Sequence, residues 1–250
     1  MSEKNVSEQG AAKTERKQTP VKSYFQEREG LLQISKLAVA KCIVNEFLHE
    51  GDSILLDAGS SLYPIAQEIA AKAKRDPAST HFTIITHNYK AFQILVEQVP
   101  RESNLNIVLA GGRYDQDLNA LFGPQTIMAY DNFFPRVVLI GTSGMVADQG
   151  LFCHGNTEEL AVKEVIFRKG ARDRIIVADH TKLGVPDSLR FGASQNLRAN
   201  VENCIVVTDL PGKESEKTLR DRFQREYERL TSVYSVRVKL VEIEQPEKTV

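Results

Sequence analysis

The stretch that decides the fold is Ser53-Ile54-Leu55-Leu56-Asp57-Ala58-Gly59-Ser60-Ser61, followed by an amphipathic segment over residues 62–74. This pattern predicts a buried β-strand, a tight Gly-Ser-Ser loop and an α-helix. Free backbone N–H groups at the start of a helix attract anions, and Ser60 and Ser61 are expected to cap it. Two interpretations stay open: a phosphate-binding cradle, or an ordinary strand-to-helix turn with a serine N-cap.

The same order of strand, polar loop and helix recurs along the chain. Further strands are predicted at residues 82–86, 106–110, 136–141, 174–179 and 203–209. Helices are predicted over residues 31–50, 61–74, 89–97, 124–132, 157–169 and 214–230, a long loop over 142–155, and an edge or hairpin strand at 233–243. This alternation indicates an α/β fold, a mostly parallel sheet with helices on both faces.

Small or polar residues stand at the carboxyl ends of the predicted strands. They are Asp57, Thr86, Gly111, Gly141, Asp179 and Asp209. Ligands of open α/β sheets bind outside those ends. We therefore expect the loops that follow these strands to surround one crevice.

Several side chains could act in that crevice. Thr86 and Asn88 offer a hydroxyl and an amide, and Gly111-Gly112 would let a third loop approach the ligand closely. Lys182 follows a predicted strand end, so it either faces the crevice or is a solvated loop lysine.

Lys163 lies four residues after Glu159, a spacing that also fits a surface ion pair on a helix. His87, His154 and His180 fall in predicted loops but lack the spacing of zinc motifs, so no metal and no cofactor are predicted.

Composition is that of a soluble globular protein. The 250 residues are 42% hydrophobic and 26% charged, with a formal net charge of −1, which gives no general attraction to nucleic acid or anionic membranes. No apolar run approaches the roughly 20 residues of a membrane span, and the three cysteines form no disulfide or metal spacing. A cytoplasmic location is expected. Residues 1–22 are predicted to be a disordered polar tail, and residues 23–250 one domain.

The ordered motifs resemble the C-terminal effector domain of DeoR-type bacterial transcriptional repressors. The matching blocks are residues 51–61, Ile85-Thr86-His87-Asn88, Ala110-Gly111-Gly112, Phe122-Gly123-Pro124, Gly150-Leu151 leading to Glu159 and Val162-Lys163, residues 177–184 and Val207-Thr208-Asp209. The resemblance implies a fold related to ribose-5-phosphate isomerase and glucosamine-6-phosphate deaminase, a phosphorylated sugar as effector, and a homo-oligomer. The ligand contacts that it implies are Asp57, Gly59, Ser60, Ser61, Thr86, Asn88, Gly111, Gly112, Lys163 and Lys182.

The chain departs from the family pattern in three places. Ser60-Ser61 stands where Thr-Thr is usual, which keeps both hydroxyls, and His87 stands where Asn is common, which puts its contact with the ligand in doubt. Residues 1–22 are too short and polar for the winged helix-turn-helix of the family. We therefore expect no direct nucleic-acid binding and no membrane binding, with DNA recognition left to a partner protein.

Two functions follow from these residues. The first is a sugar-phosphate-sensing regulatory domain. The second is an aldose–ketose sugar-phosphate isomerase, in which Asp57 or Glu159 would be the base and Lys163 or Lys182 the cation that steadies the enediolate. Turnover distinguishes the two, because a sensor leaves its ligand unchanged.

Overall fold

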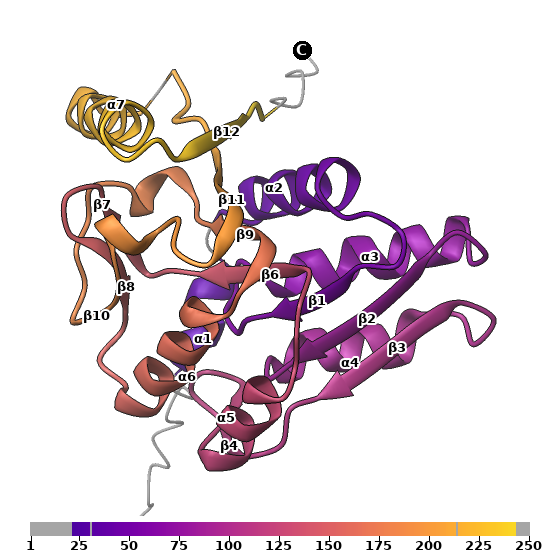
Figure 1. Ribbon diagram of the computed structural model, residues 1–250. Coiled ribbons are helices and arrows are strands. Elements are labelled where there is room, and N and C mark those ends of the chain that lie inside the picture. Colours follow the sequence, from indigo (N-terminus) through magenta and orange to yellow (C-terminus); the bar gives the residue numbers. More distant parts are fainter. Residues whose placement is uncertain (1–21, 31, 214, 244–250) are drawn as a thin grey trace, which may run out of the picture.

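Seven parallel strands form the centre of the protein in the computed structural model (Figure 1). The structure describes residues 22–30, 32–213 and 215–243, so nearly all of the predicted polar tail lies outside the described residues. In spatial order the strands are β12 (Arg237–Val241), β11 (Val201–Asp209), β9 (Ala171–Val177), β6 (Val137–Gly141), β1 (Ser53–Leu56), β2 (His81–Thr86) and β3 (Asn104–Leu109). Every neighbouring pair is parallel, which confirms the predicted sheet.

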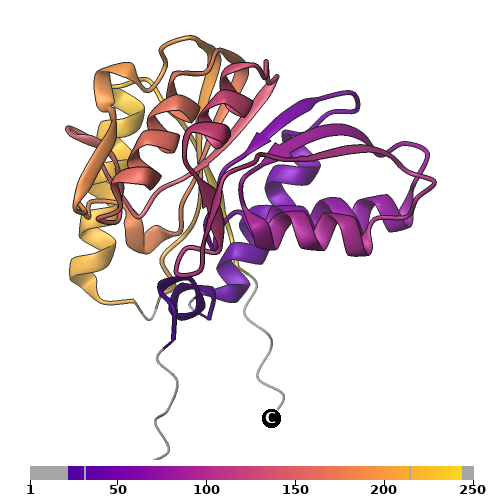
Figure 2. The ribbon, with the colours of Figure 1, turned by 90° about the horizontal axis from the view of Figure 1, so that it is seen from below.

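Helices cover both faces of this sheet, because alternate strand residues are apolar on opposite sides (Figures 1 and 2). Ile54 and Leu56 point into a core with α2 (Gln33–Glu46), α3 (Tyr63–Arg75) and α4 (Tyr89–Gln98). Leu55 points into a second core with α5 (Pro124–Asp131), α6 (Thr157–Arg168) and α7 (Lys217–Ser232). The α/β class and its two helical layers are as predicted.

The chain changes direction in the sheet between β1 and β6. It runs outward from β1 through β2 to β3, then returns to β6 beside β1 and runs the other way to β12. The loops after β1 and β6 therefore diverge, and such a switch point is where open α/β sheets bind ligands.

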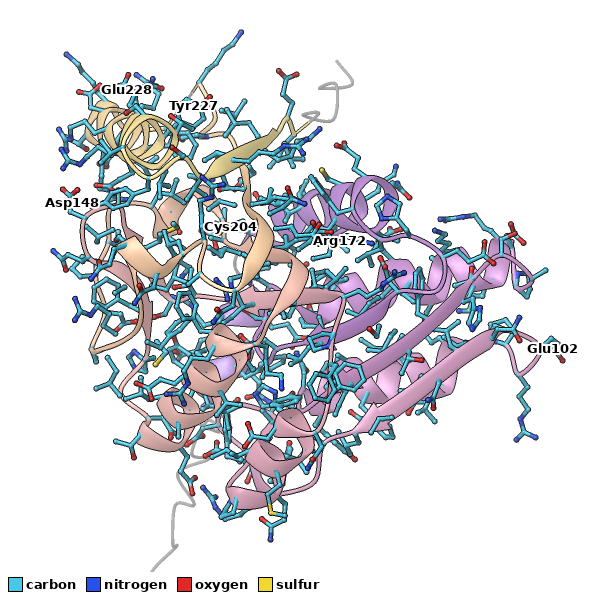
Figure 3. The ribbon with its side chains drawn as sticks, in the orientation of Figure 1. Glu102, Asp148, Arg172, Cys204, Tyr227 and Glu228 are labelled. Atoms are coloured by element: carbon cyan, nitrogen blue, oxygen red, sulfur yellow. The ribbon has the colours of Figure 1, made fainter. Side chains whose placement is uncertain are left out.

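The predicted long loop over residues 142–155 is wrong. It contains β7 (Gly144–Val146) and β8 (Gly150–Cys153), which form an antiparallel sheet with β10 (Leu189–Ala193). The glycines in this segment indicate a loop in the sequence, but they allow the backbones of paired strands to approach closely. A Cβ on Gly150 of β8 would lie 1.8 Å from the carbonyl oxygen of Gly192 on β10. Between β7 and β8, Asp148 lies beside α7 (Figure 3) and accepts hydrogen bonds from Arg229 Nε at 3.0 Å and the Tyr234 hydroxyl at 3.2 Å.

Two shorter elements were also not predicted. Helix α1 (Tyr24–Glu29) precedes α2, which begins at Gln33 and ends at Glu46, inside the predicted 31–50 range. Strands β4 (Arg113–Asp115) and β5 (Ala120–Phe122) pair as a small hairpin. The predicted strand at 233–243 is β12, an edge strand parallel to β11. In the part of the chain that the structure describes, no helix is long and apolar enough to cross a membrane.

Candidate functional site

A cavity opens at the switch point, at the carboxyl ends of β1, β6 and β9. Its empty space, including the part open to solvent, is about 840 Å³. The loops after the three strands line it with residues 58–62, 141–143 and Asp179, Thr181 and Lys182. Helices α1, α2 and α6 and the β4–β5 hairpin contribute the rest, including Arg28, Lys36, Glu159 and Lys163.

The loop after β1 has the backbone of an anion cradle. Gly59 has φ of +129°, which a side chain would disfavour, and its carbonyl accepts the Leu62 N–H at 3.1 Å. Ser60 and Ser61 do not cap the next helix, which corrects the prediction: the N-cap of α3 is Leu62, without a side-chain bond. The two serines precede the cap and line the cavity, and the Ser60 hydroxyl accepts a hydrogen bond from Lys36. Within the described residues their N–H groups have no protein acceptor.

Lys36 is the main site residue that the sequence reasoning missed. It lies on α2, its residue is only 5% exposed, and it lines the cavity. Its ammonium donates to Ser60 Oγ at 3.1 Å and to the carbonyl of Arg28, and burial lowers its pKa. A lysine on the buried face of a helix interrupts the row of apolar residues. That interruption is the sequence feature from which Lys36 could have been predicted as a site residue.

Asp57 and Lys163 form a buried ion pair beside the cavity. Asp57 Oδ2 accepts Lys163 Nζ at 2.6 Å and the Gly141 N–H at 2.9 Å, while Oδ1 accepts the Ala58 N–H at 2.8 Å. Burial lowers the pKa of Lys163, but the two nearby carboxylates outweigh it and the pKa is raised overall. The alternative of a surface Glu159–Lys163 pair is wrong, because Lys163 is buried and Glu159 is the more distant partner at 3.9 Å.

A neutral histidine lies behind this ion pair. Burial lowers the pKa of His87 to about 4, and its Nδ1 is 2.6 Å from the hydroxyl of Tyr130. Its Nε2 is 3.7 Å from Asp57 Oδ1. His87 does not line the cavity, so the doubt about its contact with a ligand agrees with its position.

Glu159 lines the cavity with a carboxyl group that is incompletely satisfied. Its Oε2 is buried and has no hydrogen-bond partner among the described residues. Burial raises the pKa of Glu159 to about 7; Lys163 opposes this shift, and Asp57, Asp187 and Asp115 add to it.

Five of the predicted ligand contacts are not in the cavity lining: Asp57, which pairs with Lys163 beside the cavity, and Thr86, Asn88, Gly111 and Gly112. The Thr86 hydroxyl donates to the carbonyl of Leu56 at 2.7 Å, and Asn88 caps α4 by accepting the Ala91 N–H at 3.0 Å. A Cβ on Gly111 would lie 3.6 Å from Gln125 Cβ, and a Cβ on Gly112 would lie 2.5 Å from the carbonyl oxygen of Phe122. These last four residues are occupied in joining β1, β2, α4 and the β4–β5 hairpin, so they support the site from outside it.

Cations outnumber carboxylates in the cavity lining: Arg28, Lys36, Lys163 and Lys182 face Glu159 and Asp179. Within the described residues, none of Arg28, Lys36 and Lys182 lies within ion-pair distance of a carboxylate. Asp179, an acidic lining residue, accepts the Thr181 N–H at 3.1 Å, and its charge partly offsets the effect of burial on the pKa of Lys36. In the part of the chain that the structure describes, no group of three or more His, Cys, Asp or Glu side chains could hold a metal ion.

The sequence pattern of the DeoR C terminal sensor domain matches residues 33–203, and the chain belongs to this family. It is 23% identical over 193 residues to the transcriptional repressor AccR of Agrobacterium fabrum, covering 77% of this chain and 67% of AccR. It is 24% identical over 137 residues to the HTH-type transcriptional repressor GlcR of Bacillus subtilis, covering 55% of this chain and 47% of GlcR. The matches thus span 67% of AccR and slightly less than half of GlcR.

Solved structures similar to this chain include two ribose-5-phosphate isomerases. One is in complex with phospho-erythronic acid, with a TM-score of 0.40 and 16% identity over 60% of this chain and 53% of that chain. The other, from Methanocaldococcus jannaschii, has a TM-score of 0.40 and 15% identity over 59% of this chain and 52% of that chain.

Proposed function

We propose that the domain binds a phosphorylated sugar in the cavity at the switch point and that occupancy regulates transcription. The observation that carries the proposal is the buried ammonium of Lys36, whose hydrogen bonds within the described residues go to a hydroxyl and a carbonyl and not to a carboxylate. A buried cation without a counter-charge is costly, and an anionic ligand removes that cost.

The phosphate fits the region where Lys36 meets the loop after β1. Lys36 donates to the Ser60 hydroxyl there, just before the start of α3, and the N–H groups of Ser60 and Ser61 have no acceptor among the described residues. Partial positive charge at a helix start and charge-assisted hydrogen bonds both favour a phosphate dianion. Lys182 supplies a second cation from the loop after β9.

A thermal-shift screen against sugar phosphates and their unphosphorylated parents tests this function, with NMR on each hit. We expect one phosphosugar to raise the melting temperature while its parent does not, and its spectrum to stay unchanged over hours. Stabilisation by parent sugars as strong as by the phosphates would contradict the proposal.

The isomerase alternative depends on Glu159 rather than Asp57. Asp57 is fully buried and both of its oxygens accept protein hydrogen bonds, so it is not available as a base. Glu159 lines the cavity with a pKa near neutrality, as a general base requires. Conversion of the bound phosphosugar into a second sugar in the NMR experiment would establish this alternative.

Partners beyond the ligand belong to the same proposal. The family relationship and the repressor relatives support a regulatory role in which a DNA-binding segment or partner protein reads the operator. We also expect a homo-oligomer, which sedimentation of the purified chain would detect.

A further inference from the structure

We propose that Glu159 selects the effector: its unpartnered carboxylate oxygen accepts a hydrogen bond from a hydroxyl or ammonium group at the end of the ligand opposite the phosphate. The inference rests on the proposed function. It states which chemical groups of the ligand bind at the end of the cavity opposite the phosphate. It starts from Glu159, a residue of the cavity lining whose buried Oε2 lacks a protein partner within the described residues.

Glu159 and the phosphate region reach the cavity from opposite sides of the sheet. Lys36 lies on α2, which packs on one face, and Glu159 lies on α6, which packs on the other. A ligand that spans the cavity between them therefore meets cations at one end and a carboxyl group at the other.

Carboxylates dominate the surroundings of Glu159. Its charged neighbours are Lys163 on its own helix, Asp57 after β1, Asp187 before β10 and Asp115 on β4. Lys163 is already paired with Asp57 at 2.6 Å, so it neutralises only part of this acidic group. Helix α1 contributes Tyr24 to the cavity lining, and burial raises the pKa of its hydroxyl.

This arrangement defines a ligand class. When Glu159 is ionised, it would repel a second phosphate at its end of the cavity, whereas a hydrogen-bond donor would satisfy Oε2, which otherwise remains desolvated without a bond. The expected effector is thus a phosphate monoester whose far end carries donors. Sugar hydroxyls and a sugar amine share that chemistry, and substitution of Glu159 distinguishes between them.

The experiment measures affinities by calorimetry for the wild-type chain and for the variants Glu159→Met and Glu159→Gln. The probes are inorganic phosphate, ribose 5-phosphate, glucose 6-phosphate and glucosamine 6-phosphate. Glu158→Gln is the matched control, because Glu158 is the preceding residue on α6, pairs with Arg113 at the surface and does not line the cavity. Circular dichroism establishes that each variant is folded.

We expect Glu159→Met to weaken binding of the best phosphosugar about tenfold or more, as for a lost hydrogen bond to a charged group, with inorganic phosphate unaffected. Glu159→Gln keeps an acceptor oxygen, so it should retain most of the affinity for a hydroxyl donor but lose it for an ammonium donor. Equal weakening of phosphosugar and inorganic phosphate, or no weakening of either, would overturn the role of Glu159. Absence of any phosphate-dependent binding by the wild-type chain would overturn the proposed function and this inference with it.

Discussion

Lys36 is a residue whose burial is explained better by a ligand than by the fold. Replacement by methionine keeps the aliphatic volume and removes the buried charge. We expect Lys36→Met to weaken phosphosugar binding by about 1.5–3 kcal/mol, the range for a hydrogen bond to a charged group. The ligand-free variant should be at least as stable as the wild type, because a desolvated ammonium is removed.

Calorimetry for affinity and urea unfolding for stability check this prediction. Lys41→Met is the control, since Lys41 is exposed on the same helix and away from the cavity. A Lys36→Met variant that loses stability but keeps its affinity would give Lys36 a structural role.

Glu159 makes the stability of the ligand-free protein depend on pH. Its pKa is raised from 4.5 to about 7 by burial, so folding favours the protonated form. The resulting stabilisation is complete below about pH 4.5 and is lost as the pH rises through 7. Relative to Glu159→Gln, the free energy of unfolding of the wild type should fall by on the order of 2 kcal/mol over that range.

Urea unfolding of both proteins between pH 5 and pH 8 measures this difference. Burial lowers the pKa of His87 to about 4, and this group contributes equally to both proteins, so it cancels in the comparison. A difference that does not change with pH would show that Glu159 titrates normally.

At the scale of elements, one ion pair joins α6 to the end of β1. Lys163→Met would leave the Asp57 carboxylate buried without its cation and should cost about 3–5 kcal/mol of stability. Adding Asp57→Asn removes the orphaned charge, so the double variant should lose less than the sum of the two single losses. A double-mutant cycle by chemical unfolding measures this coupling, and strictly additive losses would contradict it.

Helix α1 is the element that ligand binding should affect most. It has six residues and one buried side chain, Phe25, and three of its residues line the cavity. Its attachments include the Phe25 N–H, which donates to the backbone carbonyl of Asp117 at 2.9 Å, the rings of Tyr24 on His154 at 4.5 Å and Phe25 beside Tyr63 at 5.9 Å, and the bond from Lys36 to the carbonyl of Arg28. An element with so little packing opens at low free-energy cost.

We therefore expect the amides of α1 to exchange rapidly in the free protein and to be protected when a phosphosugar binds. Hydrogen exchange measured by mass spectrometry checks this prediction, with α4 as the internal reference because it packs in the core without lining the cavity. Equal exchange of α1 with and without ligand would exclude a role for this helix in closing the site.

At the scale of the whole molecule, the cavity depends on loops from both halves of the sheet. Residues 58–62 follow β1, residues 141–143 follow β6, and Lys182 follows β9, while one apolar core extends across these strands. We expect a single calorimetric unfolding transition, which ligand shifts upward as a whole. At a ligand concentration of 100 times Kd the added stability should be about 2.7 kcal/mol. Separate transitions, of which ligand moves only one, would contradict this expectation.

The sequence by itself determined the fold class and the place of the site. Continuous apolar runs such as Val137–Gly141 are typical of strands buried on both faces, and small or acidic residues at the strand ends indicated the ligand-binding edge. The sequence blocks that resemble the DeoR family predicted that the chain belongs to it, and the match to the DeoR C terminal sensor domain confirms this prediction.

Only the tertiary structure decided which polar groups meet in the cavity. Thr86 and Asn88 look like ligand contacts in sequence, but their hydrogen bonds are used within the protein, while Lys36 lies far from every motif in sequence and still touches Ser60. Local patterns fix where a strand ends and which face of a helix is apolar. Side-chain partners that are 24 or 106 residues apart, such as Lys36 with Ser60 and Asp57 with Lys163, depend on how distant elements pack, and no local pattern contains that information.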